Sequence, residues 1–209
     1  MFKNLVLVIT SLFFINGCVL GVSKLDVEYP YKDNFYNKDK TDSKIISQTL
    51  KDNNVEIIAE WVGNAKPLET SKNALGLIDR YVIPYTRSTS VVNLKIINKS
   101  VKYLNLKTEN INLKVFPENK VLYPLDLNYF KNKWPSSTIV TSDMLIDQSL
   151  AISEVIRTIF KNRIIEPNDT YEGYLAFPKI SEDSKELELT TKINVENDEF
   201  YLTFKFIKK

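Results

Sequence analysis

Side chains that commonly carry out chemistry are scarce in this chain of 209 residues. The sequence contains no histidine and a single cysteine, Cys18. The missing imidazole excludes Ser-His-Asp and Cys-His catalysis and histidine metal ligands, and a single thiol excludes intramolecular disulfides and multi-cysteine metal sites. The five glycines are spaced too widely for a phosphate-binding loop or a dinucleotide fingerprint. We therefore expect no nucleotide-dependent catalysis, whereas a serine–lysine pair assembled from distant positions stays open.

Carboxylates are the remaining candidates for acid–base chemistry, because a glycosidase uses two of them about 5 to 9 Å apart in a cleft. Asp143 and Asp147 would lie one turn apart on a helix, and a second group, Glu166, Asp169 and Glu172, would flank a turn. Both arrangements are common on exposed surfaces, where carboxylates contact solvent or backbone amides. We interpret both groups as structural, and keep a carboxylate-dependent hydrolase as an alternative.

Oxygen ligands alone can bind calcium when a loop supplies enough of them. Glu196, Asp198 and Glu199 are close in sequence, but no loop around them has the required number of ligands. The sequence therefore predicts neither a metal nor a cofactor, and we expect that the protein is not an enzyme.

One segment has a composition suited to ligand binding. Three aromatic residues are interleaved with two lysines, in the order Tyr129, Phe130, Lys131, Lys133 and Trp134. Aromatic rings stack on ligands and lysines attract anions, so these five residues are candidates for binding an anionic or sugar ligand. The alternative is that the aromatic side chains fill the core while the lysines occupy the solvent face of a strand.

The overall charge gives no electrostatic reason to expect a nucleic-acid partner, because 28 Lys+Arg against 26 Asp+Glu leave a formal charge of +2. Hydrophobic residues make up 44% and charged residues 26% of the chain. This balance is typical of a chain that folds around a buried core.

The N-terminus has the pattern of a secretory leader. Lys3 precedes an apolar run from Leu5 to Ile15 that contains no charge. The run matches the hydrophobic region of a signal peptide and is shorter than the ~20 residues of a membrane span. No later segment reaches about 18 consecutive apolar residues. We therefore predict export of the chain.

The only cysteine follows this run directly, in the segment Ile15-Asn16-Gly17-Cys18. The segment resembles a bacterial lipobox of the relaxed kind found in spirochaetal lipoproteins. The resemblance implies cleavage between Gly17 and Cys18, attachment of a diacylglycerol to the Cys18 sulfur, and acylation of the new amino terminus. Such chains would hold the protein on a membrane, because each buried methylene contributes ~0.8 kcal/mol. Val19, in place of an aspartate, favours the outer membrane or cell surface. The alternative is an ordinary signal peptide or an uncleaved anchor with an incidental cysteine.

Residues 18–54 are rich in Lys, Asp and Asn and lack a sustained apolar period, so we predict a tether. A flexible chain of about 30 residues spans roughly 30 Å, enough to hold a domain clear of lipid headgroups. The alternative is that 45–50 docks on the domain as a first strand or a turn of helix. The aromatic residues of the tether, which include Phe35 and Tyr36, are expected mostly to pack back on the domain.

From residue 55 the sequence alternates between apolar and polar residues, which is the pattern of half-buried strands. The alternating segments are 55–61, 92–96, 104–106, 111–115, 187–193 and 200–207. Many short strands separated by polar turns are typical of an antiparallel β-sandwich. The segment from Asp143 to Asn162 is an exception, since its apolar residues fall largely on one helical stripe. We predict an inserted α-helix there; the alternative is a strand over Val155–Phe160.

The segment from Ile164 to Pro178 contains a Pro-turn, then Gly173, then an apolar strand that ends in Phe177. This is similar to a motif in immunoglobulin-like extracytoplasmic domains of bacterial lipoproteins, the DUF4352 type. In that resemblance, the strand before the Asn98-Lys99-Ser100 turn is its partner. The resemblance implies an immunoglobulin-like antiparallel sandwich and no enzymatic activity.

These observations predict a signal peptide over 1–17, a lipidated cysteine and tether over 18–54, and an all-β sandwich domain over 55–209. We expect a lipid-anchored cell-envelope lipoprotein with a non-enzymatic binding role toward a protein or glycan. Two versions stay open: a surface-exposed module that engages host or environmental ligands, and a periplasm-facing accessory that binds an envelope assembly.

Overall fold

The computed structural model describes residues 35–40, 43–63, 68–69, 81–82, 84–85, 88–133 and 142–209. The predicted leader, the Gly17–Cys18 cleavage and lipidation site and the start of the predicted tether lie outside these residues. The described residues from 35 to 68 and from 82 to 209 belong to one compact unit.

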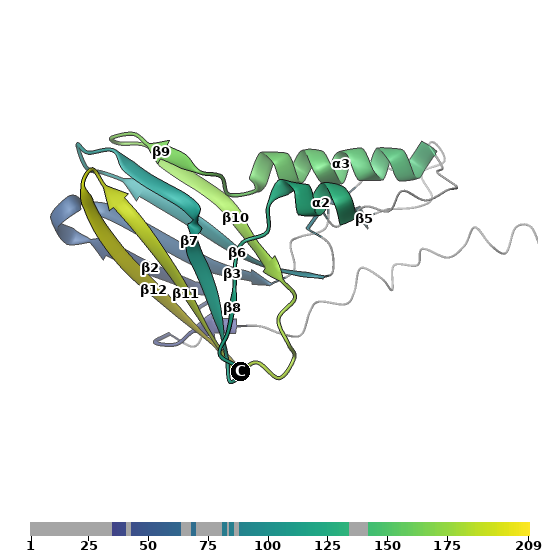
Figure 1. The fold of residues 1–209 in the computed structure, drawn as a ribbon, viewed down its shortest axis with the longest axis horizontal. Helices are drawn as coiled ribbons and strands as arrows, with labels where there is room; N and C mark the ends of the chain where they lie inside the picture. The colour runs from purple at the N-terminus through teal and green to yellow at the C-terminus, as the bar shows by residue number, and fades with distance from the viewer. Residues whose placement is uncertain are drawn as a thin grey trace, which may run out of the picture. The chain divides into compact units, whose positions relative to one another are not determined.

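Two antiparallel sheets form the fold, which confirms the predicted all-β sandwich (Figure 1). The first sheet has the order β1 (Phe35–Asn37), β12 (Asp198–Lys208), β11 (Glu186–Val195), β7 (Leu104–Phe116) and β8 (Lys120–Leu122), and β9 (Arg163–Ile165) also pairs with β7. The second sheet has the order β10 (Thr170–Pro178), β6 (Thr89–Asn98), β3 (Val55–Gly63) and β2 (Ile45–Leu50). A one-turn 3₁₀ helix, η3 (Lys51–Asn53), connects β2 to β3, and β4 (Leu68–Glu69) pairs separately with β5 (Tyr81–Val82).

Alternation along the strands builds the main core between the two sheets. Every second residue of β11 from Leu187 to Val195 is buried. Leu189, for example, lies opposite Phe204 on β12 and Leu113 on β7, and all three are fully buried. A slip of one residue would turn this whole set toward solvent, so burial fixes the register.

Strand β7 contains both of the alternating segments 104–106 and 111–115, which appear as separate strands in the sequence. The register between β7 and β11 shifts between Thr191 and Ile193, and residues 107–110 have no partner on β11. This irregular stretch is held instead by Asn162, whose side-chain oxygen accepts hydrogen bonds from the Thr108 N–H at 2.7 Å and the Thr108 hydroxyl at 2.9 Å. The bulge therefore joins β7 to the segment that follows the long helix.

The predicted tether is wrong in its second half, because β1 and β2 both lie within residues 18–54. Phe35 is fully buried and packs edge-on against Trp61, with the ring centroids 5.0 Å apart. Ile46 is also buried, and the alternative of a first strand over 45–50 is confirmed. The folded body therefore begins no later than Phe35 rather than at residue 55.

The inserted helix is confirmed as α3 (Ser142–Thr158), and a shorter helix, α2 (Leu127–Lys133), precedes it. Helix α3 ends four residues before the predicted Asn162 because the chain turns onto the edge of β10 (Figure 1). There the Phe160 N–H donates to the Tyr174 carbonyl at 2.9 Å. Ile159 forms only an isolated bridge with Tyr174, so the alternative of a strand over Val155–Phe160 is wrong.

Gly173 allows this close approach. A Cβ atom at Gly173 would lie 2.9 Å from the Phe160 Cα and 3.1 Å from its nitrogen, both of which are backbone atoms. Contacts this short cannot be relieved by rotating a side chain. The glycine in the motif is therefore required by packing.

Asn98, fully buried at the end of β6, links two turns through its side chain. The amide nitrogen donates to the carbonyl oxygens of Lys102 at 2.8 Å, Ile165 at 3.3 Å and Glu166 at 2.9 Å. The amide oxygen accepts from the N–H and the hydroxyl of Ser100, at 3.1 and 2.6 Å. One side chain thus fastens the β6–β7 turn to the β9–β10 turn.

Replacing this amide should destabilise the fold strongly. We expect Asn98→Ala to lower the free energy of unfolding by about 3 kcal/mol, because each buried group left without a partner costs about 1–3 kcal/mol. Asn98→Asp should cost at least as much, since it places an acceptor against three carbonyl oxygens. Urea unfolding measures both, with the exposed Asn105→Ala as control, expected within about 0.5 kcal/mol of wild type. Equal effects at positions 98 and 105 would contradict the role assigned to the buried amide.

Gly173→Ala tests the close contact with Phe160. We expect a loss of about 1–3 kcal/mol, the usual cost of overpacking, in urea unfolding. The Phe160 amide should also exchange its hydrogen faster, because its bond to Tyr174 is displaced. Thr170→Ala, at an exposed position of the same strand, is the matched control and should leave that exchange rate unchanged. Slow exchange retained in Gly173→Ala would show that the contact relaxes without cost.

Candidate functional site

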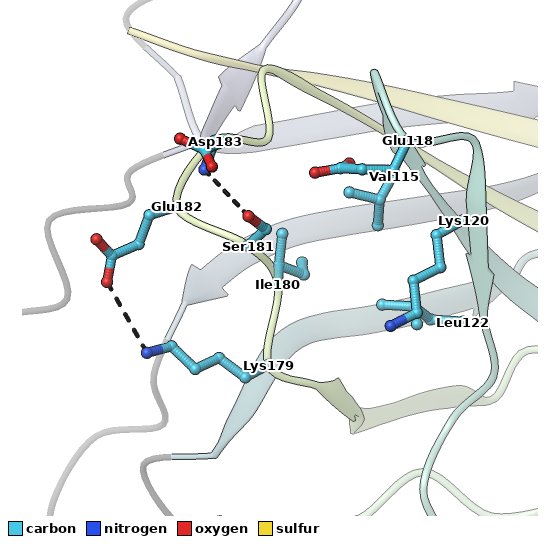
Figure 2. A pocket seen from close by; sticks show the side chains of 9 residues that line it. All are labelled: Val115, Glu118, Lys120, Leu122, Lys179, Ile180, Ser181, Glu182 and Asp183. Atoms are coloured by element: carbon cyan, nitrogen blue, oxygen red, sulfur yellow. Dashed lines mark hydrogen bonds and ion pairs between the residues drawn. The ribbon is translucent and has the colours of Figure 1, made fainter.

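A groove opens at one end of the sandwich, between the β7–β8 hairpin and the connection from β10 to β11 (Figure 2). Its volume is about 560 Å³, within the range usual for small-molecule sites. The residues that line it are Val115, Glu118, Lys120, Leu122, Lys179, Ile180, Ser181, Glu182 and Asp183.

The floor of the groove is aliphatic. Val115, Leu122 and Ile180 are nearly or fully buried and belong to the main core. Val115 and Leu122 are brought together by the β7–β8 pairing, in which Leu113 lies opposite Leu122. The floor is thus the outer edge of the main core, of which only a small apolar area is left exposed.

The β10–β11 connection that forms one wall is fixed to both sheets. The Ile180 N–H lies 3.4 Å from the Ser90 hydroxyl oxygen of β6, and the Lys185 N–H donates to the Phe116 carbonyl of β7 at 2.9 Å. Within the wall, the Asp183 N–H donates to the Ser181 hydroxyl oxygen at 3.2 Å. A wall tied at both ends keeps the shape of the groove without a ligand.

Charged side chains of both signs stand on the rim. Lys179 and Glu182 form a long ion pair of 3.9 Å on one wall. In the view of Figure 2, the carboxylates of Glu118 and Asp183 lie toward one end of the groove, and the amines of Lys120 and Lys179 toward the other. In the described part of the chain, Glu118, Lys120 and Asp183 form no ion pair with another side chain. They are therefore available to a ligand.

The groove lining combines charged groups with aliphatic carbon. Its lining offers carboxylates, ammonium groups and aliphatic carbons, and its one hydroxyl, on Ser181, already accepts a backbone hydrogen bond. The chain has no histidine that could activate this hydroxyl as a nucleophile. The arrangement can attract and orient a charged ligand over an apolar surface.

Phe130, predicted as a ligand-binding residue, is instead a core residue. Its side chain is fully buried and contacts Tyr85 edge-on, with centroids 5.2 Å apart. Tyr129 is half-buried against Phe130. The alternative that the aromatic side chains fill the core is therefore confirmed for Phe130, but the segment is the helix α2 and not the strand that this alternative assumed. The helix turns Phe130 toward a second core, which it shares with Val155 of α3 and with Ile159, the residue that directly follows α3.

The remaining candidates of that segment are not brought into a site. Lys131 is exposed on α2. Lys133 is the last residue of α2, and its side chain lies outside the described part of the structure, as does Trp134.

Tyr85 holds the second core to α3 through a hydrogen bond. Its hydroxyl lies 2.7 Å from the Thr158 hydroxyl, which donates its own proton to the Glu154 carbonyl at 2.7 Å. Tyr85 is therefore the donor to Thr158. Burial raises the pKa of the Tyr85 hydroxyl well above its usual value of about 10. Burial also raises the pKa of Tyr174, with a smaller contribution from nearby Glu60.

The carboxylates singled out in the sequence make structural contacts. Asp169 pairs with Arg163 at 3.5 Å, and Glu172 accepts a hydrogen bond from Asn93 at 2.7 Å. Glu166 is exposed. In the part of the chain that the structure describes, these residues do not face each other across the groove, which other residues line.

Among the described residues, no group of three or more Cys, His, Asp or Glu side chains could hold a metal ion. Glu196 and Glu199 instead pair with lysines, at 3.8 and 2.5 Å. The side chains of Asp143 and Asp147 lie outside the described residues. Over the same described ranges, none of the helices has both the length and the apolar character needed to cross a membrane.

Comparison with known proteins adds little. No protein family matches the chain, and no curated protein is similar to it. The solved structures that resemble it in part include the following two. The crystal structure of the yjhA protein from Bacillus subtilis is 7% identical with a TM-score of 0.36, over 66% of this chain and 71% of that one. The X-ray structure of structural-genomics target SoR45 is 13% identical with a TM-score of 0.31, over 79% and 85%. Scores this low carry no functional argument.

Sequence reasoning did not identify the groove residues. They come from the β7–β8 hairpin and from the connection over 179–183, which are about sixty residues apart in the sequence. The pairing of β11 with β7 could have located them. It places Glu186, at the start of β11, opposite Phe116, at the end of β7, and so brings the segments next to these two residues together.

Tyr85→Phe tests the buried hydroxyl. We expect a loss of about 1 kcal/mol near neutral pH, from one hydrogen bond. The pKa of Tyr85 is higher in the folded than in the unfolded state, so the buried neutral hydroxyl contributes its full stability below the unfolded pKa of about 10. This contribution to the free energy of unfolding decreases as the pH rises above that value. The free energy of unfolding should therefore fall less steeply above pH 10 in Tyr85→Phe than in wild type. Urea unfolding across this range checks it, with exposed Tyr201→Phe as control; identical slopes for wild type and Tyr85→Phe would contradict the assignment.

Proposed function

We propose that this chain is a lipid-anchored lipoprotein of the cell envelope, at the outer membrane or cell surface, whose sandwich binds a ligand without catalysis. The observation that carries the binding role is the groove, which combines a core-derived aliphatic floor, unpaired charges on its rim and one wall that is held by both sheets. The anchor is supported by the position of the only cysteine directly after the apolar run.

The position of β1 limits the distance between the folded body and the membrane in such a lipoprotein. Residues 19–34 separate Cys18 from Phe35, so 16 residues lie between the lipid and the first strand. Even a fully extended chain of this length reaches at most about 55 Å. The anchor would therefore keep the groove near the membrane surface, where it can meet ligands of the envelope or of the surroundings.

Metabolic labelling with a palmitate analogue tests the anchor. We expect wild type to take up the label and to partition with membranes, because the Cys18 sulfur is the lipid attachment point. Cys18→Ala should lose the label and appear in the soluble fraction. Cells that express Ser23→Ala serve as the control for a nearby substitution and should label as wild type. An unlabelled wild-type protein would overturn the proposed localisation.

Protease added to intact cells then distinguishes the two versions of this role. Degradation of the labelled protein would place the sandwich on the cell surface. Protection until the outer membrane is permeabilised would place it in the periplasm, as an accessory of an envelope assembly, and would contradict the surface-exposed version.

A further inference from the structure

The arrangement of charge in the groove leads to a ligand class. We propose that the groove binds a short peptide or amino acid in its zwitterionic form, with an aliphatic side chain on the floor and the two terminal charges at opposite ends. This inference deepens the proposed binding role and rests on it, and it does not depend on the lipid anchor.

Separation of the two signs is the first argument. Glu118, on the β7–β8 turn, and Asp183, on the opposite wall, direct carboxylates toward the same end of the groove (Figure 2). A ligand amine between them would be attracted by both walls. Lys120 stands toward the other end, where it can receive a ligand carboxylate. A ligand with one charge of each sign satisfies both ends.

The presence of unpaired charges of both signs argues against ligands that carry several charges of one sign. Three carboxylates and two lysines line the groove, and one lysine and one carboxylate already pair with each other. A polyanion would be repelled by Glu118 and Asp183, and a polycation by Lys120. A zwitterion adds no net charge and leaves no rim charge opposed by a like charge.

The residues of the groove floor indicate what kind of side chain the ligand carries. Val115, Leu122 and Ile180 present only aliphatic carbon, and their exposed fractions are 6% or less, so a small patch is left for contact. A branched aliphatic side chain matches this patch in chemistry. Removing apolar surface from water contributes about 25 cal/mol per Å², whereas a polar side chain here would lose its hydrogen bonds to water.

The size of the groove limits the ligand to a few residues. A volume of about 560 Å³ accommodates a small molecule rather than a folded partner. The rim charges are exposed, and exposed ion pairs contribute only about 0.2–1 kcal/mol each. We therefore expect a dissociation constant near the millimolar range, with a modest contribution from each charge.

Equilibrium dialysis of the full chain in detergent micelles against radiolabelled L-leucyl-L-leucine tests the inference. We expect saturable binding. Lys120→Gln and Asp183→Asn should each weaken it about two- to fivefold, the factor that one exposed ion pair supplies. Lys51→Gln and Asp198→Asn remove the same charges at exposed positions outside the groove and should bind as wild type. Urea unfolding of all four variants verifies that they fold.

Blocking the ligand charges provides an independent measurement on the wild-type protein. L-leucyl-L-leucine amide keeps only the amine, and N-acetyl-L-leucyl-L-leucine keeps only the carboxylate. Both should compete with the labelled dipeptide about two- to fivefold less well than the unmodified dipeptide. Stronger competition by either blocked form would assign the groove to a cation or an anion and overturn the zwitterion.

Two further outcomes also overturn the inference. One is the absence of saturable binding at millimolar dipeptide, and the other is equal binding by the groove variants and their controls. Neither affects the anchor, because palmitate labelling of Cys18 reads that property separately. Conversely, a wild-type protein that binds the dipeptide but takes up no palmitate label would support the ligand class proposed for the groove and would contradict only the proposed lipid anchor.

Discussion

The buried amide of Asn98 is the interaction on which the far end of the sandwich depends. Polar groups that are shielded from water must find partners within the protein, and at this point several backbone carbonyls are enclosed at once. A single side chain with two donors and an acceptor satisfies them. Because those carbonyls belong to the β6–β7 and β9–β10 turns, the amide also fixes how the two sheets meet. No aliphatic residue of similar size could do both.

A second constraint is that the β10–β6 sheet is covered on both faces where the helices lie. Val92 faces the main core, while its neighbour Val91 belongs to the second core with Tyr85 and Phe130. The first four residues of β6 are consequently all buried, and alternation disappears there. A strand covered on both faces appears in a sequence as a continuous apolar run. The absence of a Cβ at Gly173 then allows the segment after α3 to reach the edge of this sheet.

Much of the fold could be predicted from the sequence, because each long strand contacts the core on one face and solvent on the other. The patterns around Ile57 and Leu189 therefore predicted strands, and the stripe that contains Val155 predicted a helix. The first strand was missed because Phe35 lies in a polar segment, and its place in the core depends on long-range contacts such as those with Trp61 and β12. For Phe130 both interpretations stayed open, because composition alone cannot distinguish an aromatic side chain that binds a ligand from one that packs.

The groove could not be predicted from the sequence for a different reason. Its walls are turns with no periodicity, and they become neighbours only through long-range strand pairing. Local sequence patterns indicate which face of a strand or helix is buried. The position of a groove depends instead on where strands that are far apart in the sequence end relative to one another. A candidate site of this kind becomes visible only when the register of the sheets is known.

The pairing of β1 with β12 has a consequence for the order of assembly. The first strand of the body has the last strand as its neighbour, and the last strand lies between β1 and β11. A chain synthesised from its amino terminus presents β1 long before its partner strand is available. The first sheet therefore reaches its full width only after the C-terminal residues have been made, so its completion depends on a contact between strands that are far apart in the sequence.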